Sequence, residues 1–106
     1  MAKTRLQLGK QGEDIINAAL RRNHYSIIDR NWRCAFGEVD LIAKRDSEWF
    51  FVEVRTRRSP NRISPEMGLT HRKRATMEKV ARYYLGKYVN EVNVAWHLSL
   101  FLAYIM

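Results

Sequence analysis

The segment from Gly37 to Arg57 constrains the fold most, because two stretches of alternating apolar and polar residues flank a short polar link. Alternation with a period of two is typical of β-strands. The link Arg45-Asp46-Ser47 consists of turn-forming residues. The segment therefore predicts a β-hairpin, and Asp46 and Ser47 are taken as its two loop residues, since a loop of another length would stagger Asp40 relative to Glu53.

A loop of that length fixes which residues of the two strands face each other. It predicts three cross-strand pairs: Lys44 with Trp49, Ile42 with Phe51, and Asp40 with Glu53. Two opposed carboxylates repel each other, and a hard divalent cation with oxygen ligands would relieve the conflict. The alternative is that these two acids are solvated and neutralised by Arg55 and Arg57. The other face of the hairpin is apolar and is expected to face the core: Val39, Leu41, Ala43, Phe50, Val52 and Val54.

The length and composition predict one globular domain over residues 1–106, with 46% hydrophobic and 28% charged residues. The net charge of +8 indicates a polyanionic partner, most simply nucleic acid. The expected nucleic acid is DNA rather than RNA, although charge alone does not distinguish the two. A membrane surface is not expected, because no basic helix also carries a strong aromatic and leucine face.

The chain has a single cysteine, Cys34, so neither a disulfide framework nor a cysteine-based zinc site is expected. The N-terminal residues have no apolar stretch like that of a secretory signal, and no apolar run is long enough to span a membrane. These features together favour a cytoplasmic protein.

Residues 6–22 predict a first helix whose apolar stripe is formed by Ile16, Ala19 and Leu20 and widened by Ile15. Glu13 lies on or beside this stripe. It is either an acid near the helix start, favoured by the helix dipole, or an acid that points across at Asp40 and Glu53. After this helix we expect a short strand over residues 25–29 and a link over residues 30–36.

A basic loop, TRRSPNRISPEMG, follows the hairpin, and residues 70–88 then predict a second helix with Thr70 as its N-cap. Its predicted buried stripe is Met77, Val80, Ala81, Tyr84, Leu85 and Tyr88, and its basic residues, Lys73 among them, are predicted to lie largely away from that stripe. Basic side chains of the loop and helix are candidate phosphate contacts: Arg57, Arg58, Arg62, Arg72, Lys73 and Arg74. The alternative is a solvated loop whose charge keeps the protein soluble.

Residues 92–100 alternate again and predict a last strand, and the six residues that follow it are apolar. An uncovered apolar tail or edge strand promotes self-association. We therefore expect this end of the chain to be buried against the sheet or in a homodimer formed through the C-terminal strand.

Several motifs together resemble the bacterial YraN family. They are Gly12-Glu13 in a helix, Asn31 and Arg33 after it, GEVDLIA, FVEVRTR, and SPE before a basic helix that ends ARYYL. The resemblance covers roughly residues 8–88. It implies a restriction-endonuclease-like fold of the PD-(D/E)xK type, which is an α/β fold with a mixed central sheet flanked by helices.

The same resemblance implies a site for Mg²⁺ or Mn²⁺. Asp40 would be the first metal-binding acid, and Glu53 would be the acid of the E-x-K motif. The Val54 carbonyl and Glu13 would complete the metal site. Arg55 stands at the position of the motif's lysine. Arginine stays protonated and cannot act as a base, but it can hold phosphate or stabilise developing charge.

Three functions remain open from the sequence. One is a divalent-metal-dependent endonuclease for structured or damaged DNA, with Asp40, Glu53 and Arg55 as catalytic residues. A second is a nucleic-acid-binding module on the same fold without chemistry. The third is an interaction protein whose apolar tail recruits another chain.

Overall fold

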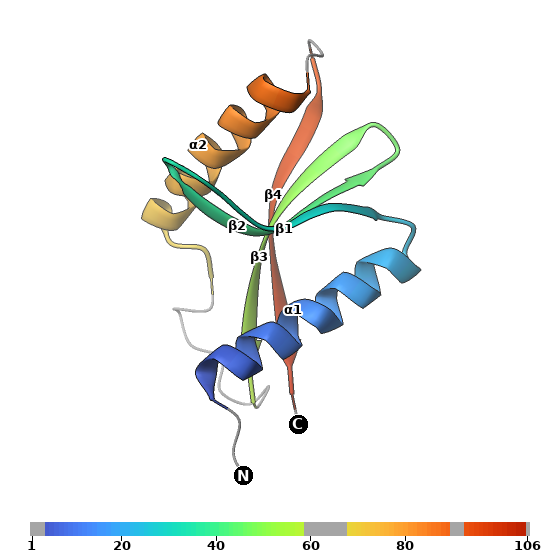
Figure 1. Cartoon of the computed structure of the whole chain (residues 1–106), viewed down its shortest axis with the longest axis vertical. Coiled ribbons are helices and arrows are strands. Elements are labelled where there is room, and N and C mark those ends of the chain that lie inside the picture. The colour runs from blue at the N-terminus through green and yellow to red at the C-terminus, as the bar shows by residue number, and fades with distance from the viewer. Residues whose placement is uncertain (1–3, 59–67, 90–92, 106) are drawn as a thin grey trace.

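The computed structural model describes residues 4–58, 68–89 and 93–105. In chain order the elements are α1 (Arg5–Arg22), β1 (Ser26–Cys34), β2 (Gly37–Arg45), β3 (Glu48–Arg57), α2 (His71–Tyr88) and β4 (Ala95–Tyr104). The four strands form one sheet in the order β1-β2-β3-β4 (Figure 1). The pairs β1–β2 and β2–β3 are antiparallel and β3–β4 is parallel, so the sheet is mixed. This confirms the predicted α/β class.

The hairpin of β2 and β3 has the predicted loop. Asp46 and Ser47 form the turn, and Asp46 takes a left-handed φ of 56°, which an aspartate tolerates well. The pairs Lys44–Trp49 and Ile42–Phe51 confirm the predicted register. The backbone pairing of the two strands ends at Leu41 and Val52, one residue before the two acids.

The first strand is longer than predicted. Residues 30–34, which were expected to form a link, continue β1 and pair with β2 from Arg30–Leu41 to Cys34–Gly37. The polar residues Arg30, Asn31 and Arg33 obscured this strand in the sequence. It is stabilised by pairing with β2 and by Trp32, which packs against the core next to Tyr84.

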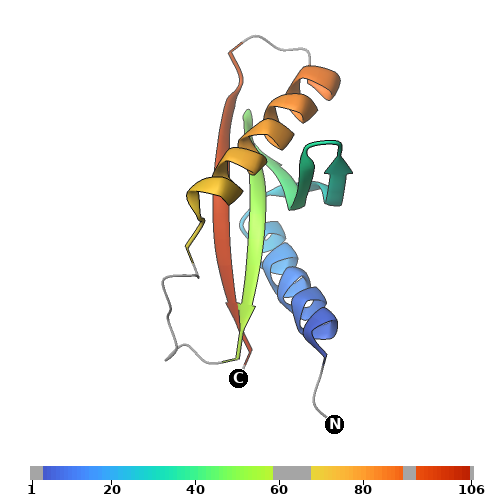
Figure 2. The same ribbon diagram turned by 90° about the vertical axis from the view of Figure 1, so that its left-hand side faces the viewer.

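The two helices cover opposite faces of the sheet, as Figures 1 and 2 show. The core beneath α2 contains Val39, Ile42, Trp49, Phe51, Met77, Val80, Ala81 and Tyr84. The core beneath α1 contains Ile16, Leu20, Leu41, Val52 and Ala103. The prediction that Val39 shares a face with Leu41 is therefore wrong. Ile42 and Phe51 are also fully buried, because α2 covers the face that carries them.

Both helices begin and end close to the predicted residues. Thr4 and Gln7 form a capping box at the start of α1, Asn23 caps its end, and Thr70 is the N-cap of α2. Two stripe residues were wrongly predicted to be buried: Ile15 is 41% exposed and Tyr88 is 53% exposed. Each lies at the border of its stripe, and Tyr88 still contacts the ring of Trp32 in β1 with its own ring.

The apolar end of the chain extends β4 to Tyr104 instead of forming a separate tail. It pairs with β3 along its whole length, with Leu100 opposite Glu53, and Ala103 is buried. The tail thus joins the edge of the sheet, where only Ala103 of residues 101–105 is buried, so the expected burial is met in part. A homodimer through this strand stays a prediction. Val92, the expected start of the strand, lies outside the described residues. Neither described helix is long and apolar enough to cross a membrane.

Candidate metal and nucleic-acid site

An open cleft of about 480 Å³ lies between the first half of α1 and the ends of β2 and β3. It brings together the three acids that the sequence singled out, although they lie on three different elements. The residues that line it are Arg5, Leu8, Gly9, Glu13, Asp40, Glu53, Val54, Arg55, Thr56 and Arg57. The convergence favours the interpretation of these acids as a site over that of separate surface acids.

Asp40 lies on β2, just beyond the end of its backbone pairing with β3. Its Oδ2 accepts a hydrogen bond of 2.7 Å from the backbone N–H of Val54. This side-chain hydrogen bond takes the place of the next backbone hydrogen bond between β2 and β3. Burial raises the pKa of the Asp40 carboxyl above its ordinary value. The Val54 hydrogen bond and the charge of Lys73 lower that pKa. The Val54 N–H is thus engaged, and the role of its carbonyl stays a prediction.

Glu53 is largely enclosed, with a side chain only 14% exposed. Its Oε2 lies 3.3 Å from Lys73 Nζ, and its Oε1 lies 3.8 Å from Arg55 Nε. Burial raises the pKa of Glu53, and the negative charge of Asp40 raises it further, while Lys73 and Arg55 lower it. The net shift of the Glu53 pKa is upward, so the two cations, which come from different elements, offset only part of the effect of burial and of Asp40.

Glu13 lies in the third turn of α1, so its predicted position near the helix start is wrong, and the first turn contains no acid. Its Oε1 is buried and has no hydrogen-bond partner among the described residues. Burial raises the pKa of Glu13, and the charge of Asp40 raises it further. A hydrogen bond from the Asn31 side chain and the charge of Arg30 lower that pKa.

Gly12 explains how Glu13 reaches the cleft. A Cβ at this position would collide with the side chain of Thr56 on β3. Only glycine lets α1 approach β3 this closely. The resulting contact sets the position of the neighbouring Glu13 relative to the two acids on the strands.

The structure adds two residues to the site that were not assigned to it from the sequence. Asn31 lies between the residues paired with Leu41 and Val39, at the level of Asp40, and has a left-handed φ of 52°. Lys73 was predicted to lie away from the buried stripe of α2, which is wrong. It lies one helical turn before Met77, on the same side, and this spacing could have placed it facing the sheet.

The donor chemistry of the cleft suits a hard divalent cation, because its acids offer carboxylate oxygens and one oxygen of Glu13 is buried without a partner. Within the described ranges, however, no group of three or more acid, histidine or cysteine side chains is arranged closely enough to hold a metal ion. Asp40 is engaged by Val54 and Glu53 by Lys73. An incoming cation would therefore have to compete with Lys73 for Glu53.

The predicted phosphate contacts are dispersed. Arg57 lines the acid cleft at the end of β3, and its Nη1 donates a hydrogen bond to the Thr56 carbonyl. Arg58, Arg72 and Arg74 are exposed, but none of them lines that cleft. Arg74 borders a separate hollow beside Trp96 and His97. Arg62 lies outside the described residues.

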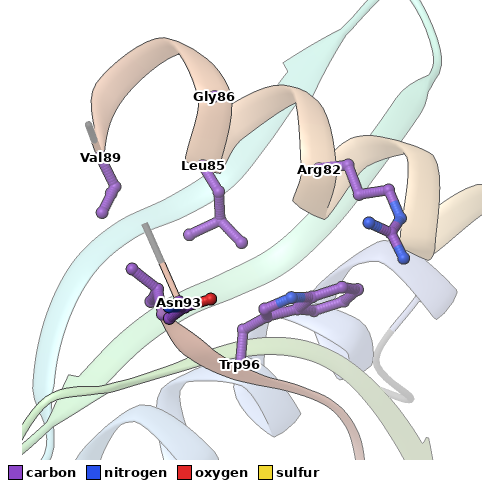
Figure 3. Close-up of a pocket in the computed structure, with 7 residues that line it drawn as sticks. Arg82, Leu85, Gly86, Val89, Asn93 and Trp96 are labelled. Carbon is purple, nitrogen blue, oxygen red and sulfur yellow. The ribbon is translucent and has the colours of Figure 1, made fainter. Parts of the chain in front are cut away.

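A different hollow, of about 310 Å³, lies between the end of α2 and the start of β4 (Figure 3). The Arg82 guanidinium lies over the ring of Trp96 there, 5.3 Å from its centroid. Leu85, Val89 and Val94 make much of the remaining lining apolar, and no carboxylate of residues 4–58, 68–89 or 93–105 contributes to it. The described lining of this hollow therefore differs from that of the acid cleft.

Comparison with known proteins identifies the family. The sequence model of Uncharacterised protein family UPF0102 matches residues 12–100. A UPF0102 protein of Moorella thermoacetica is 41% identical over 86 residues, which cover 81% of this chain and 72% of the relative. One from Roseiflexus castenholzii is 35% identical over 99 residues, which cover 93% and 80% of the two chains. The chain therefore belongs to the UPF0102 family, the YraN family that its motifs resemble.

Proposed function

We propose that this protein binds nucleic acid and hydrolyses its phosphodiester bonds with Mg²⁺ or Mn²⁺ held by Glu13, Asp40 and Glu53. The observation that carries the proposal is the convergence of these acids in one open cleft. Asp40 raises the pKa of both other acids, so the fold brings together charges that repel each other. Such arrangements concentrate at functional sites. The mixed sheet between two helices is compatible with the restriction-endonuclease-like fold implied by the resemblance.

Each residue of the cleft has a proposed role. Glu13, Asp40 and Glu53 supply carboxylate oxygens, with the Val54 carbonyl as a further ligand. A divalent cation bound there would neutralise phosphate charge and make water a better nucleophile at neutral pH. Arg55 holds the reacting phosphate through its planar guanidinium and stabilises the charge that develops on it. Arg57, at the end of the same strand, holds a neighbouring phosphate.

The substrate we favour is DNA with a structured or branched form, and the proposed setting is the cytoplasm. The net charge of +8 supports a polyanionic substrate. Cys34 is a free thiol, which suits a reducing compartment.

The test is cleavage of branched and flap DNA with Mg²⁺ or Mn²⁺, comparing the parent protein with Asp40→Asn and Asp46→Asn. The first variant keeps an oxygen to accept the Val54 N–H but loses the charge. The second makes the same change in the exposed hairpin turn, where asparagine suits the left-handed φ. We expect Asp40→Asn to lower cleavage at least about 100-fold without weakening DNA binding, and Asp46→Asn to leave both unchanged. Cleavage that survives in Asp40→Asn, or is absent from the parent with both metals, would overturn the proposal.

A second candidate is a nucleic-acid-binding module without chemistry. The specific observation that favours it is Lys73, which already neutralises Glu53 at 3.3 Å. A protein of this kind would bind nucleic acid with the same affinity in chelator and in Mn²⁺, and its affinity would fall steeply with salt. Binding that requires the metal would exclude this alternative.

A further inference from the structure

A second groove, of about 700 Å³, lies on the β1 side of α1. The residues that line it are Arg5, Leu6, Gly9, Lys10, Glu13, Arg30, Asn31 and Arg33. Arg5, Gly9 and Glu13 also line the acid cleft. These three residues are spaced four apart and form one line along α1, so the two depressions meet along this line.

The charges along this continuous path follow an order. Three cations line only the groove beside β1, namely Lys10, Arg30 and Arg33, and Arg5 lies on the line that this groove shares with the acid cleft. Arg55 and Arg57 line the β3 end. The three acids of the candidate site lie between them. A path that is basic at both ends and acidic in the middle suits a chain of phosphates that passes over a cation site.

Part of the positive charge at the β1 end is already paired. Arg30 Nη2 lies 2.7 Å from Asp14, and Arg33 Nε lies 2.8 Å from Glu38. The acids of both pairs are about half exposed, so the pairs are weak and readily exchanged for phosphate. Arg5 and Lys10 form no ion pair within the part of the chain that the structure describes, and both remain available.

We infer that one strand of the nucleic acid lies along this whole path, from Arg33 and Lys10 across the three acids to Arg55 and Arg57. The inference rests on the proposed function for its ligand class and adds where the strand runs. The contacts predicted from the sequence place the strand only on the side of β3 and α2. The groove beside β1 extends the binding surface to the other side of the acids, where Arg5 and Lys10 hold the phosphate backbone.

Gly9 offers a steric test of this path. It lies on the line shared by the two depressions, and a Cβ added there meets nothing within 4 Å. Gly9→Leu therefore places a bulky side chain at the junction without a clash at its Cβ, and it improves helix propensity. Gly86→Leu is the matched control, because Gly86 is also in a helix with open space around its Cβ. It borders the distant hollow shown in Figure 3.

A pair of double variants tests the charge. Arg5→Gln/Lys10→Gln removes one cation from the line that the two depressions share and one from the groove beside β1. Arg22→Gln/Lys79→Gln removes the same net charge from exposed positions that border neither depression. The probe is a fluorescent oligothymidylate of about 16 nucleotides. Its binding is measured by fluorescence anisotropy in chelator over a range of salt concentrations, with thymidine monophosphate as a competitor.

We expect Gly9→Leu to weaken binding at least about tenfold and Gly86→Leu to leave it unchanged. The Arg5/Lys10 variant should lower the slope of log affinity against log salt by about 1.4, since each phosphate contact with a single strand contributes about 0.7. The mononucleotide should compete poorly, because it fills only one end of the path. Equal effects of the two charge variants, or an unaffected Gly9→Leu whose circular dichroism matches the parent, would overturn the inference.

These outcomes separate the inference from the proposed function. If Asp40→Asn abolishes cleavage but the groove variants bind normally, the strand path is wrong and the nuclease proposal stands. If the groove variants bind weakly but no metal supports cleavage, the strand path stands and the nuclease proposal fails. If the parent does not bind the oligonucleotide even at low salt, the strand path is wrong, and the nuclease proposal is decided by the cleavage of branched and flap DNA alone.

Discussion

The ammonium of Lys73 lies 3.3 Å from Oε2 of Glu53, whereas Nε of Arg55 lies 3.8 Å from the other oxygen of that carboxylate. The closer of these two cations thus comes from α2, not from the strand that carries the acid. The Lys73 side chain is 30% exposed and that of Glu53 is 14% exposed, so solvent screens their attraction only partly. Lys73 therefore neutralises the acid site internally and competes with any divalent cation for Glu53.

This competition predicts that Lys73→Met binds Mn²⁺ more tightly than the parent. Removing a positive charge from beside the acids removes a repulsion of about 1 kcal/mol or more, which corresponds to at least about fivefold in affinity. Calorimetric titration at pH 8 measures the change, because high pH limits protonation of the acids. Lys79→Met, on the exposed side of α2, is the control and should bind like the parent. Weaker binding by Lys73→Met would mean that the lysine supports the ion instead of opposing it.

The raised pKa of Glu13 predicts how stability depends on pH. A carboxyl whose folded-state pKa lies above its unfolded value stabilises the fold fully below the unfolded value, here about 4.5. That stabilisation is lost as the pH rises through the folded-state value. Glu13→Gln should therefore raise the melting temperature at pH 7 by about 2–5 °C in chelator and change it little at pH 4.

Glu78→Gln provides the control for this measurement. Glu78 pairs with Arg82 at 3.0 Å on the exposed side of α2, so losing its charge should not raise the melting temperature at either pH. A lower melting temperature for Glu13→Gln at pH 7 would show that the ionised carboxylate stabilises the fold, contrary to the direction of its pKa shift.

The hairpin was predictable from the sequence because its alternation and its turn chemistry agree. They correctly placed the Asp46-Ser47 turn and the pairs on either side of it. The convergence of Asp40 and Glu53 followed from that register. The position of Glu13 did not follow from local pattern alone, because it depends on how closely Gly12 lets α1 pack against Thr56.

The misplaced elements share a physical cause. Residues 30–34 form part of a strand because pairing with β2 outweighs their polar composition, and local propensity does not show such a partner. Lys73 faces the sheet because its ammonium forms an ion pair with Glu53, a residue 20 positions earlier in the chain. In both cases an interaction with a distant segment determines the structure. The expectation for residues 30–34 and for Lys73 rested only on the pattern of their own segment.

Asn31 combines an unusual backbone with a contact to the site, which predicts the effect of replacing it. Asn31→Gly keeps the left-handed φ of 52° without strain but removes the amide that hydrogen-bonds Glu13. Because that hydrogen bond lowers the pKa of Glu13, the Glu13 carboxyl of the variant should titrate at a higher pH than that of the parent. Carboxyl chemical shifts followed by NMR over a pH series report this directly. Asn93→Gly, at a left-handed residue that lines the distant hollow, should leave the Glu13 titration unchanged.

The contact between Gly12 and Thr56 predicts that replacing two glycines of α1 by alanine has opposite effects on stability. Gly12→Ala forces α1 away from β3 and should lower the free energy of unfolding by about 1–3 kcal/mol, despite the better helix propensity of alanine. Gly9→Ala has open space around its new Cβ and should raise stability by up to about 1 kcal/mol. Urea unfolding curves measure both changes.

Combining the Gly12 change with Thr56→Ala separates steric conflict from any other effect. Removing the Thr56 hydroxyl and its methyl group clears two of the three atoms that the new Cβ would meet, including the nearest, and leaves the Thr56 Cβ at 3.0 Å. The double variant should therefore be more stable than the sum of the two single changes predicts, with a coupling of about 1 kcal/mol or more. It should also recover Mn²⁺ binding lost by Gly12→Ala, because α1 returns Glu13 to the cleft. Additive effects of the two substitutions would instead mean that this contact does not set the helix position.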